Sequence, residues 1–158
     1  TAYEIPKRDW SSDVCSSDLK KVIYTGPIDA FYNYVYGRLN YRSLKFETER
    51  VETSDYQGNA VINYTETCIP YTRIVEHKHF DYVNKPYTYI TKEYPMEYSE
   101  GMVPYYPVND SVNTSVYEKY KTLTESDSNI VFGGRLAEYR YYDMHQVIGS
   151  ALHICKQL

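Results

Sequence analysis

Alternating polar and apolar positions dominate the middle of the chain. Residues 44–51 alternate along their whole length, which is typical of a strand with one solvated face. Further short segments of strand character follow at 60–64, 72–80 and 87–94, with turn residues between them and no intervening helical pattern. Such a series predicts an antiparallel sheet.

Apolar residues at helical spacing predict helices elsewhere in the chain. They cover residues 28–35, 111–125 and 143–157. Short apolar segments at 21–25 and 129–132 are predicted as strands. The sequence therefore predicts an α+β fold, in which an antiparallel sheet domain is followed by a C-terminal strand and helix.

Two glycines and an arginine follow the last predicted strand, at Gly133, Gly134 and Arg135. Because glycine has no Cβ, a turn at this point lets backbone N–H groups approach a ligand. The predicted helix that begins at Asp143 adds a positive dipole end. This pattern fits a phosphate or an electron-rich cofactor edge, and it also fits a plain connection between a strand and a helix.

Composition narrows the function classes. Tyrosine is the outlier, with 21 copies in 158 residues, and its ring and hydroxyl suit half-buried sheets and polar ligand clefts. A formal net charge of −4 without a basic block argues against a nucleic-acid partner. No apolar run reaches the length of about 18 residues that a membrane span needs.

Cysteine and histidine positions do not predict a metal site. Cys15, Cys68 and Cys155 are far apart and form no Cys-x-x-Cys pair, which favours reduced thiols in the cytoplasm over a disulfide framework or a zinc site. His77 and His79 alternate on a predicted strand, but zinc needs three or four ligands and no third is recognisable nearby.

Two arginines and two tyrosines are candidates for an anion site. Arg73, Arg135, Tyr106 and Tyr141 each lie in or beside a turn marked by glycine or proline. Arginine binds phosphate through two parallel hydrogen bonds, and tyrosine hydroxyls can complete such a site. Surface ion pairs for the arginines and packing for the tyrosines remain the alternatives.

The first 19 residues differ from the rest of the chain. Ser-Ser-Asp occurs at 11–13 and again at 16–18, without a helical or strand period. The string also resembles translated sequencing-adapter read-through. Residues 1–19 are therefore predicted to be non-native or disordered, and they are left out of the fold prediction.

Three blocks of the sequence resemble the bacterial UDP-galactopyranose mutases. They are Tyr-Thr-Gly-Pro-Ile-Asp at 24–29, Ile-Pro-Tyr-Thr-Arg-Ile-Val-Glu-His-Lys-His-Phe at 69–80, and Gly-Gly-Arg-Leu-Ala-Glu-Tyr-Arg-Tyr-Tyr-Asp-Met at 133–144. The resemblance runs from about residue 20 to the end. It implies a cytoplasmic, homodimeric isomerase that interconverts UDP-galactopyranose and UDP-galactofuranose. The cofactor is reduced FAD, whose N5 forms an adduct with the sugar.

The resemblance also implies roles for single residues. Arg73 matches the catalytic, diphosphate-binding arginine of the family. Tyr106 and Tyr141 match its two diphosphate-binding tyrosines, and Asn63 matches an asparagine on the substrate side.

Four further positions match contacts to FAD, at Gly134, Arg135, Asp143 and Met144. No Gly-x-Gly-x-x-Gly fingerprint of a dinucleotide-binding fold occurs in the sequence. Nothing in it corresponds to the helical domain that grips uridine in the family. The chain is therefore expected to be a C-terminal part of the enzyme and inactive alone.

The expected division has a substrate-side sheet domain at 20–128 and, at 129–158, the strand and helix of an incomplete, Rossmann-like FAD-binding domain. Two other interpretations remain open. The sheet could act alone as a non-catalytic carbohydrate- or nucleotide-binding module, with its tyrosine-rich strands as the binding face. The sequence could also be the translation of a broken or chimaeric assembly.

Overall fold

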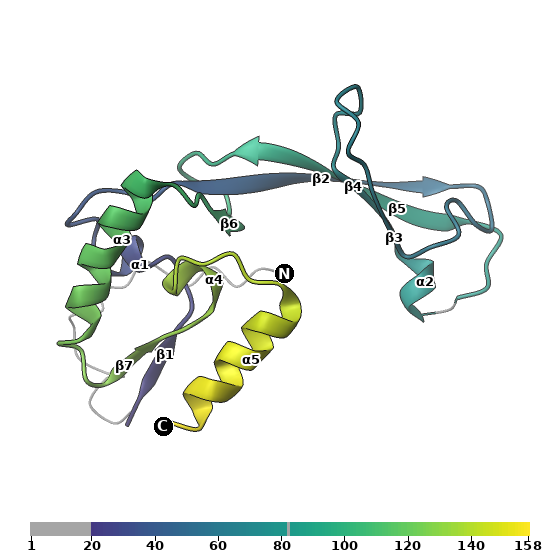
Figure 1. Cartoon of the computed structure of the whole chain (residues 1–158). Helices are drawn as coiled ribbons and strands as arrows, with labels where there is room; N and C mark the ends of the chain where they lie inside the picture. The colour runs from purple at the N-terminus through teal and green to yellow at the C-terminus, as the bar shows by residue number, and fades with distance from the viewer. Residues whose placement is uncertain (1–19, 82) are drawn as a thin grey trace. The chain divides into compact units, whose positions relative to one another are not determined.

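The computed structural model describes residues 20–81 and 83–158, so the expectation for residues 1–19 lies outside the described part of the chain. The chain forms two compact units (Figure 1). Residues 38–114 form one, which we call the sheet unit, and residues 20–37 and 115–158 belong to the other, which we call the α/β unit.

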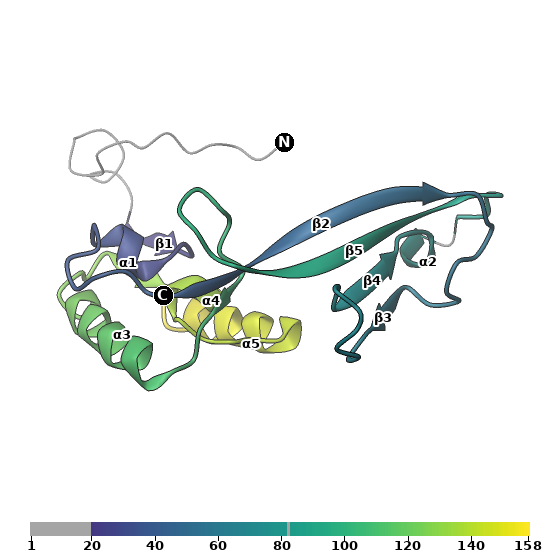
Figure 2. The ribbon, with the colours of Figure 1, turned by 90° about the horizontal axis from the view of Figure 1, so that it is seen from above.

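The sheet unit contains an antiparallel sheet with the strand order β3-β4-β5-β2-β6, and the predicted antiparallel sheet is confirmed. The strands are β2 (Tyr41–Val51), β3 (Val61–Asn63), β4 (Arg73–Glu76), β5 (Thr88–Glu97) and β6 (Tyr106–Pro107). Figure 2 shows β2 and β5 as a long twisted pair. Their register runs without interruption from Arg42 opposite Glu97 to Val51 opposite Thr88.

The two faces of this sheet differ. Residues that lie directly opposite each other on neighbouring strands share a face, and successive residues alternate between faces. One face carries Ile74, Ile90 and Glu76, which are 1%, 0% and 0% exposed, and forms the core of the unit. The other face carries Arg73 and Glu93, and we call it the Arg73 face.

The predicted strand at 72–80 is too long. β4 ends at Glu76, and residues 78–81 form the short helix α2 (Lys78–Asp81). Glu76 explains the change of direction, because its carboxylate accepts the backbone N–H of Tyr56 at 3.1 Å and that of Gln57 at 2.9 Å. A fully buried acceptor thus joins the end of β4 to the loop before β3.

The α/β unit is built on two parallel strands, β1 (Val22–Tyr24) and β7 (Ile130–Phe132). Its helices are α1 (Ile28–Phe31), the part of α3 (Ser111–Thr124) that follows residue 114, α4 (Gly134–Ala137) and α5 (Met144–Cys155). The compact units do not coincide with the division expected at residue 128. Because β1 pairs with β7, residues 20–37 cluster with the C-terminal segment.

Tyrosine side chains build much of the core of the α/β unit. Tyr120 is 0% exposed, and its hydroxyl donates to Gly37 O at 2.6 Å and accepts Tyr36 N–H at 3.0 Å. Its ring stacks on Tyr32, which in turn packs on Phe132. The many tyrosines therefore fill the interior as well as half-exposed strands, because a buried hydroxyl can find partners in the backbone.

The last predicted helix is confirmed as α5. The side-chain oxygen of Gln146 accepts Asp143 N–H at 2.8 Å, as in a capping box. Met144, Ile148 and Leu152 are 79%, 59% and 59% exposed, so α5 presents apolar side chains on its surface. Among the described residues, no helix combines the length and apolar character that crossing a membrane requires.

Replacing Glu76 by alanine is expected to destabilise the chain by about 1–3 kcal/mol, because the part-buried amides of Tyr56 and Gln57 lose a charged acceptor. The pKa of Glu76 is lowered: burial raises it, but the amides of Gln57 and Tyr56, the Thr88 hydroxyl and the nearby His79 together outweigh burial. A lowered folded-state pKa adds stability above the unfolded value of about 4.5. That stability is lost as the pH falls through the folded-state pKa.

Urea unfolding from neutral to acid pH measures both effects. Glu76→Gln should flatten the acid end of the stability profile. The control Glu52→Gln removes an exposed carboxylate that only pairs with Arg50 at the surface, and should leave the profile unchanged. A wild-type profile in Glu76→Gln would refute the role of this carboxylate.

Candidate functional site

Arg73 lies in a row of four residues that crosses the sheet. Asn63 on β3 is opposite Arg73 on β4, which is opposite Glu93 on β5, which is opposite Phe46 on β2. Arg73 Nε donates to Asn63 Oδ1 at 2.9 Å, and its Nη1 lies 3.7 Å from Glu93 Oε2. The structure therefore brings together two predicted site residues, Asn63 and Arg73, and adds Glu93.

The row orients Arg73 without burying it. The Arg73 side chain is 42% exposed, whereas that of Glu93 is 15% exposed. A guanidinium group has five N–H donors, and the contact with Asn63 uses the one on Nε. An arginine held in this way at its stem can present a planar fork to a phosphate or carboxylate.

Glu93 was not among the residues predicted from the sequence. The alternation at 87–94 placed it on a strand, but the sequence gives no pairing between strands. Only the register, in which Glu93 faces Arg73, shows that the two side chains meet. If the register had been known, the opposite charges of Glu93 and Arg73 would have indicated their contact.

Tyr106 lies on β6, opposite Arg42 at the start of β2. Arg42 and Phe46 are on the same side of β2, so Tyr106 shares the Arg73 face. The structure does not bring Tyr106 to Arg73, because β2 and β5 lie between their strands and Arg42 is about 13 Å along β2 from Phe46. The adjacent Tyr105 is nearer to the row, since its ring centroid lies 5.6 Å from that of Phe46.

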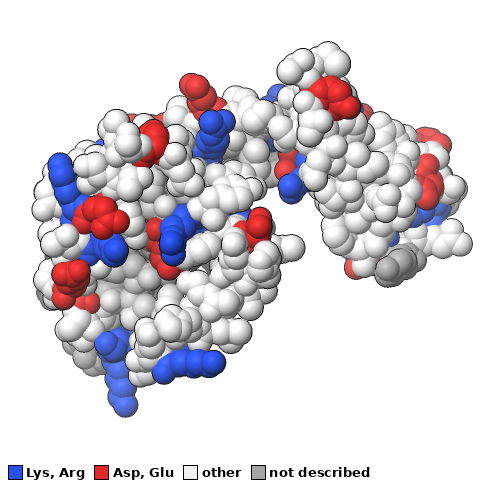
Figure 3. Space-filling model, in the orientation of Figure 1, with Lys and Arg blue, Asp and Glu red and all other residues white. Residues whose placement is uncertain are grey.

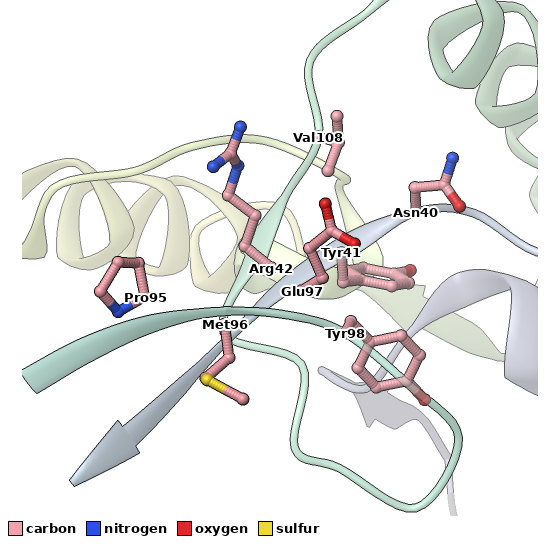
Figure 4. A pocket seen from close by; sticks show the side chains of 8 residues that line it. All are labelled: Asn40, Tyr41, Arg42, Pro95, Met96, Glu97, Tyr98 and Val108. Carbon is pink, nitrogen blue, oxygen red and sulfur yellow. The ribbon is translucent and has the colours of Figure 1, made fainter. Parts of the chain in front are cut away.

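An open hollow of about 450 Å³ lies where β2 begins and β5 ends (Figure 4). In Figure 4, Arg42 and Glu97 lie on one side of the crossing strands, with Met96 and Tyr98 on the other. It is lined by Asn40, Tyr41, Arg42, Pro95, Met96, Glu97, Tyr98 and Val108. None of these described lining residues is a predicted site residue, although Arg42 is the β2 partner of Tyr106.

The amides of the Gly133–Gly134 turn are engaged within the chain, which agrees with the plain connection between a strand and a helix that the sequence left open. Gly133 N–H donates to Tyr24 O at 3.0 Å, and Gly134 N–H donates to Glu138 Oε2 at 2.9 Å. Glycine is needed at 134 because its φ is +84°. At 133 a Cβ would lie 3.1 Å from Ile154 Cδ1. The two glycines therefore serve the geometry of the loop.

The remaining predicted residues of the α/β unit lie on this loop and at the start of α5. Arg135 Nε donates to Tyr142 O at 2.8 Å, which fixes the base of its guanidinium. Tyr141 is 57% exposed and Met144 is 79% exposed, and Asp143 immediately precedes α5. Together they offer hydrogen-bond donors, an acceptor and an apolar thioether on the surface of one unit.

Asp55, Glu76 and His79 form a group that the sequence did not reveal. His79 Nε2 lies 3.5 Å from Asp55 Oδ1 and 3.2 Å from Glu76 Oε2, and the three atoms lie within 4.8 Å of one another. His77 is directed elsewhere, with Nε2 2.7 Å from Thr91 Oγ1. His79 Nε2 is buried and makes no hydrogen bond to the described residues, so its contacts with the two carboxylates are electrostatic. Glu76 also accepts the backbone amides of Tyr56 and Gln57.

Charges of both signs are mixed over the surface. Figure 3 shows Lys and Arg side chains interspersed with Asp and Glu on the face in view. The ion pairs on the sheet unit follow the same pattern. Lys45 pairs with Glu47 along β2, and Lys92 on β5 pairs with Glu49 on β2. Arg73 is therefore distinguished by its neighbours in the row rather than by a large positive patch.

Comparison with known proteins identifies the family. The family model described as UDP-galactopyranose mutase matches residues 6–141. The chain is 47% identical over 136 residues to a probable UDP-galactopyranose mutase of Klebsiella pneumoniae, covering 85% of this chain and 35% of that protein. It is 39% identical to a dTDP-fucopyranose mutase of Escherichia coli over 146 residues, covering 92% of this chain and 38% of that protein.

A UDP-galactopyranose mutase of Mycoplasma pneumoniae is 37% identical over 145 residues, covering 88% of this chain and 36% of that protein. The chain thus spans little more than a third of the length of these curated relatives. The residues matched by the family model include both Arg73 and the Gly-Gly-Arg loop. The chain belongs to the UDP-galactopyranose mutase family.

Proposed function

We propose that this chain is part of a UDP-galactopyranose mutase and supplies the arginine that binds the substrate diphosphate. The observation that carries the proposal is the fixed but exposed guanidinium of Arg73, held between Asn63 and Glu93. The family and the names of the relatives support the reaction, an isomerisation of a nucleotide sugar between its pyranose and furanose forms.

Arg73 would act on the diphosphate. Its planar fork can make two parallel hydrogen bonds to phosphate oxygens, which a lysine cannot do. Negative charge develops on the diphosphate as it leaves the sugar, and a preorganised cation stabilises that charge without reorganising. Asn63 and Glu93 hold the guanidinium in place before the substrate arrives. As the family resemblance implies, Tyr106 and Tyr141 are proposed to bind a substrate diphosphate through their hydroxyls.

FAD is the cofactor that the family implies, and the residues present fit part of it. Arg135 offers donors to the electron-rich edge of a flavin ring, and Met144 offers an exposed apolar contact. Asp143 immediately precedes Met144. The amide of Gly134 already donates to Glu138, so Gly134 would not donate to FAD. Because it has no side chain, it would instead let the cofactor lie close to the backbone. Reduced FAD would supply the nucleophile for the sugar carbon.

The α/β unit is proposed to be part of a Rossmann-like FAD-binding domain. Parallel strands occur almost only in sheets whose two faces are covered by helices. The parallel pairing of β1 with β7, in a unit that also contains α1, α4 and α5, supports the proposal. As the family resemblance implies, we further propose that the whole protein is a cytoplasmic homodimer.

A second substrate is favoured by one observation, the 39% identity to a dTDP-fucopyranose mutase. Both candidate substrates are sugars linked to a pyrimidine nucleoside diphosphate, so Arg73 would serve either. The full-length protein should therefore be assayed with UDP-galactopyranose and with dTDP-fucopyranose, in the presence of reduced FAD. Furanose formation from neither substrate would overturn the proposed function.

Arg73→Ala in the full-length protein is expected to lower turnover by about 10²–10³, the usual cost of losing one preorganised donor to a developing anion. Arg73→Lys should recover only part of this loss, because a point charge on a flexible stem cannot make the two-point contact. Furanose formation with dithionite-reduced flavin measures the rate, and a thermal melt in parallel measures stability.

Arg50→Ala is the matched control. Arg50 lies on the same face of β2, where it pairs with the exposed Glu52 and stacks over Tyr87 at 4.0 Å. Its loss should leave turnover near wild type. If Arg73→Ala also turns over at the wild-type rate, Arg73 is an ordinary surface residue, for which truncation costs at most about 1 kcal/mol of stability.

The 158-residue chain purified alone is expected to carry no flavin. Dinucleotide affinity in Rossmann-like folds comes largely from a glycine-rich turn and the helix dipole that follows it, and the Gly133–Gly134 amides are engaged internally. Absorbance of the purified chain in the visible range tests this directly. A yellow protein with flavin bound in stoichiometric amount would contradict the expectation.

A further inference from the structure

Glu138 joins three parts of the α/β unit through one carboxylate. Its Oε2 accepts the N–H of Gly134 at 2.9 Å and the hydroxyl of Ser150 at 3.0 Å. Its Oε1 accepts the hydroxyl of Tyr142 at 3.1 Å. Gly134 lies at the start of α4, Tyr142 at the end of the loop that follows α4, and Ser150 on the second turn of α5. One side chain thereby closes the segment 133–142 onto α5.

The backbone of this segment adopts conformations that need support. Gly134 has a φ of +84°, and Tyr139 has a φ of +45°, which is uncommon for a residue with a side chain. Tyr139 is 5% exposed, and its ring stacks on Tyr117 with centroids 5.7 Å apart. Such conformations persist where the surroundings over-determine them, and they cluster at ligand sites.

The same segment carries the residues proposed to face the ligands. Arg135 is the third residue of the segment, and its Nε donates to the carbonyl of Tyr142, the last residue, at 2.8 Å. Tyr141 lies between them and is 57% exposed. Tyr142 therefore links Glu138 to Arg135: its hydroxyl donates to the Glu138 carboxylate, and its carbonyl accepts Arg135 Nε–H.

The negative charge of Glu138 affects the pKa of the nearby Tyr117. Burial, and next the Glu138 carboxylate, raise the pKa of Tyr117 to about 12, so Tyr117 stays protonated near neutral pH. A glutamate suits this position because an ionised carboxylate accepts several donors at once, whereas glutamine has a single acceptor oxygen. The donors of Gly134, Tyr142 and Ser150 fit that capacity.

We propose that Glu138 is a positioning residue, which holds the segment 133–142 so that Arg135 and Tyr141 are in place to bind the flavin edge and the substrate diphosphate. This inference rests on the proposed function. In this proposal both oxygens of Glu138 are engaged by donors within the chain, so it acts on neither ligand directly. Its effect passes through the amide of Gly134 and the hydroxyl of Tyr142, and small displacements of positioned groups are costly in catalysis.

The test uses the full-length protein that carries this segment, with the variants Glu138→Ala, Glu138→Gln and Ser150→Ala. Glu125→Gln is the matched control, because Glu125 is an exposed carboxylate in the same unit. Four quantities are measured for each: the thermal midpoint, the FAD dissociation constant, the visible spectrum of bound flavin, and kcat and KM at saturating FAD.

Glu138→Ala is expected to lower kcat by about 10–100-fold at saturating FAD, to weaken FAD binding and to shift the flavin spectrum. Glu138→Gln should lie between alanine and wild type, because one acceptor oxygen remains, and Ser150→Ala should have a smaller effect in the same direction. The Glu125 control should match wild type. If Glu138→Ala does not fold, the glutamine and Ser150 variants decide the question.

Wild-type kcat and an unshifted flavin spectrum in Glu138→Gln and Ser150→Ala, with or without a lower thermal midpoint, would overturn the proposal, since a purely structural tether would give that result. Failure of the proposed function looks different. In that case the wild-type protein itself forms no furanose from either nucleotide sugar, whatever the variants do to flavin binding.

Discussion

The register between β2 and β5 is the constraint on which the sheet unit depends. It runs unbroken from the pair Arg42–Glu97 to the pair Val51–Thr88, and β4 and β6 attach to the two sides of this ribbon. A slip of one residue would move every side chain of a strand to the opposite face. Glu93 would then turn toward the core, and Arg73 would lose the neighbour that steers it.

Each unit uses a carboxylate to hold a backbone turn. In the sheet unit, the fully buried Glu76 accepts the amides of Tyr56 and Gln57. In the α/β unit, Glu138 accepts the amide of Gly134. Hydrogen bonds to a charged acceptor are stronger than those between neutral groups, and they weigh more where water is scarce. Loops without regular secondary structure are thus given fixed shapes by two glutamates.

Much of the fold could be predicted from the sequence, because alternation and helical spacing report directly on which side of an element is buried. The antiparallel strands and the helix α5 follow from such patterns. The end of β4 could not be predicted, since it depends on Glu76 binding a loop about 20 residues earlier in the chain. Glu93 was missed for a related reason: pairing between strands is a property of the folded sheet, not of either strand alone.

The Gly-Gly-Arg motif shows that one sequence pattern can have two physical explanations. Glycine was expected there to expose amides to a phosphate, but both amides are used within the chain. What the glycines provide is a left-handed turn at Gly134 and close packing against Ile154 at Gly133. These two features set the path of the loop, and the loop then places Arg135. The candidate residue Arg135 is therefore oriented by a constrained backbone. Arg73 in the sheet unit is oriented instead by the register of its strand.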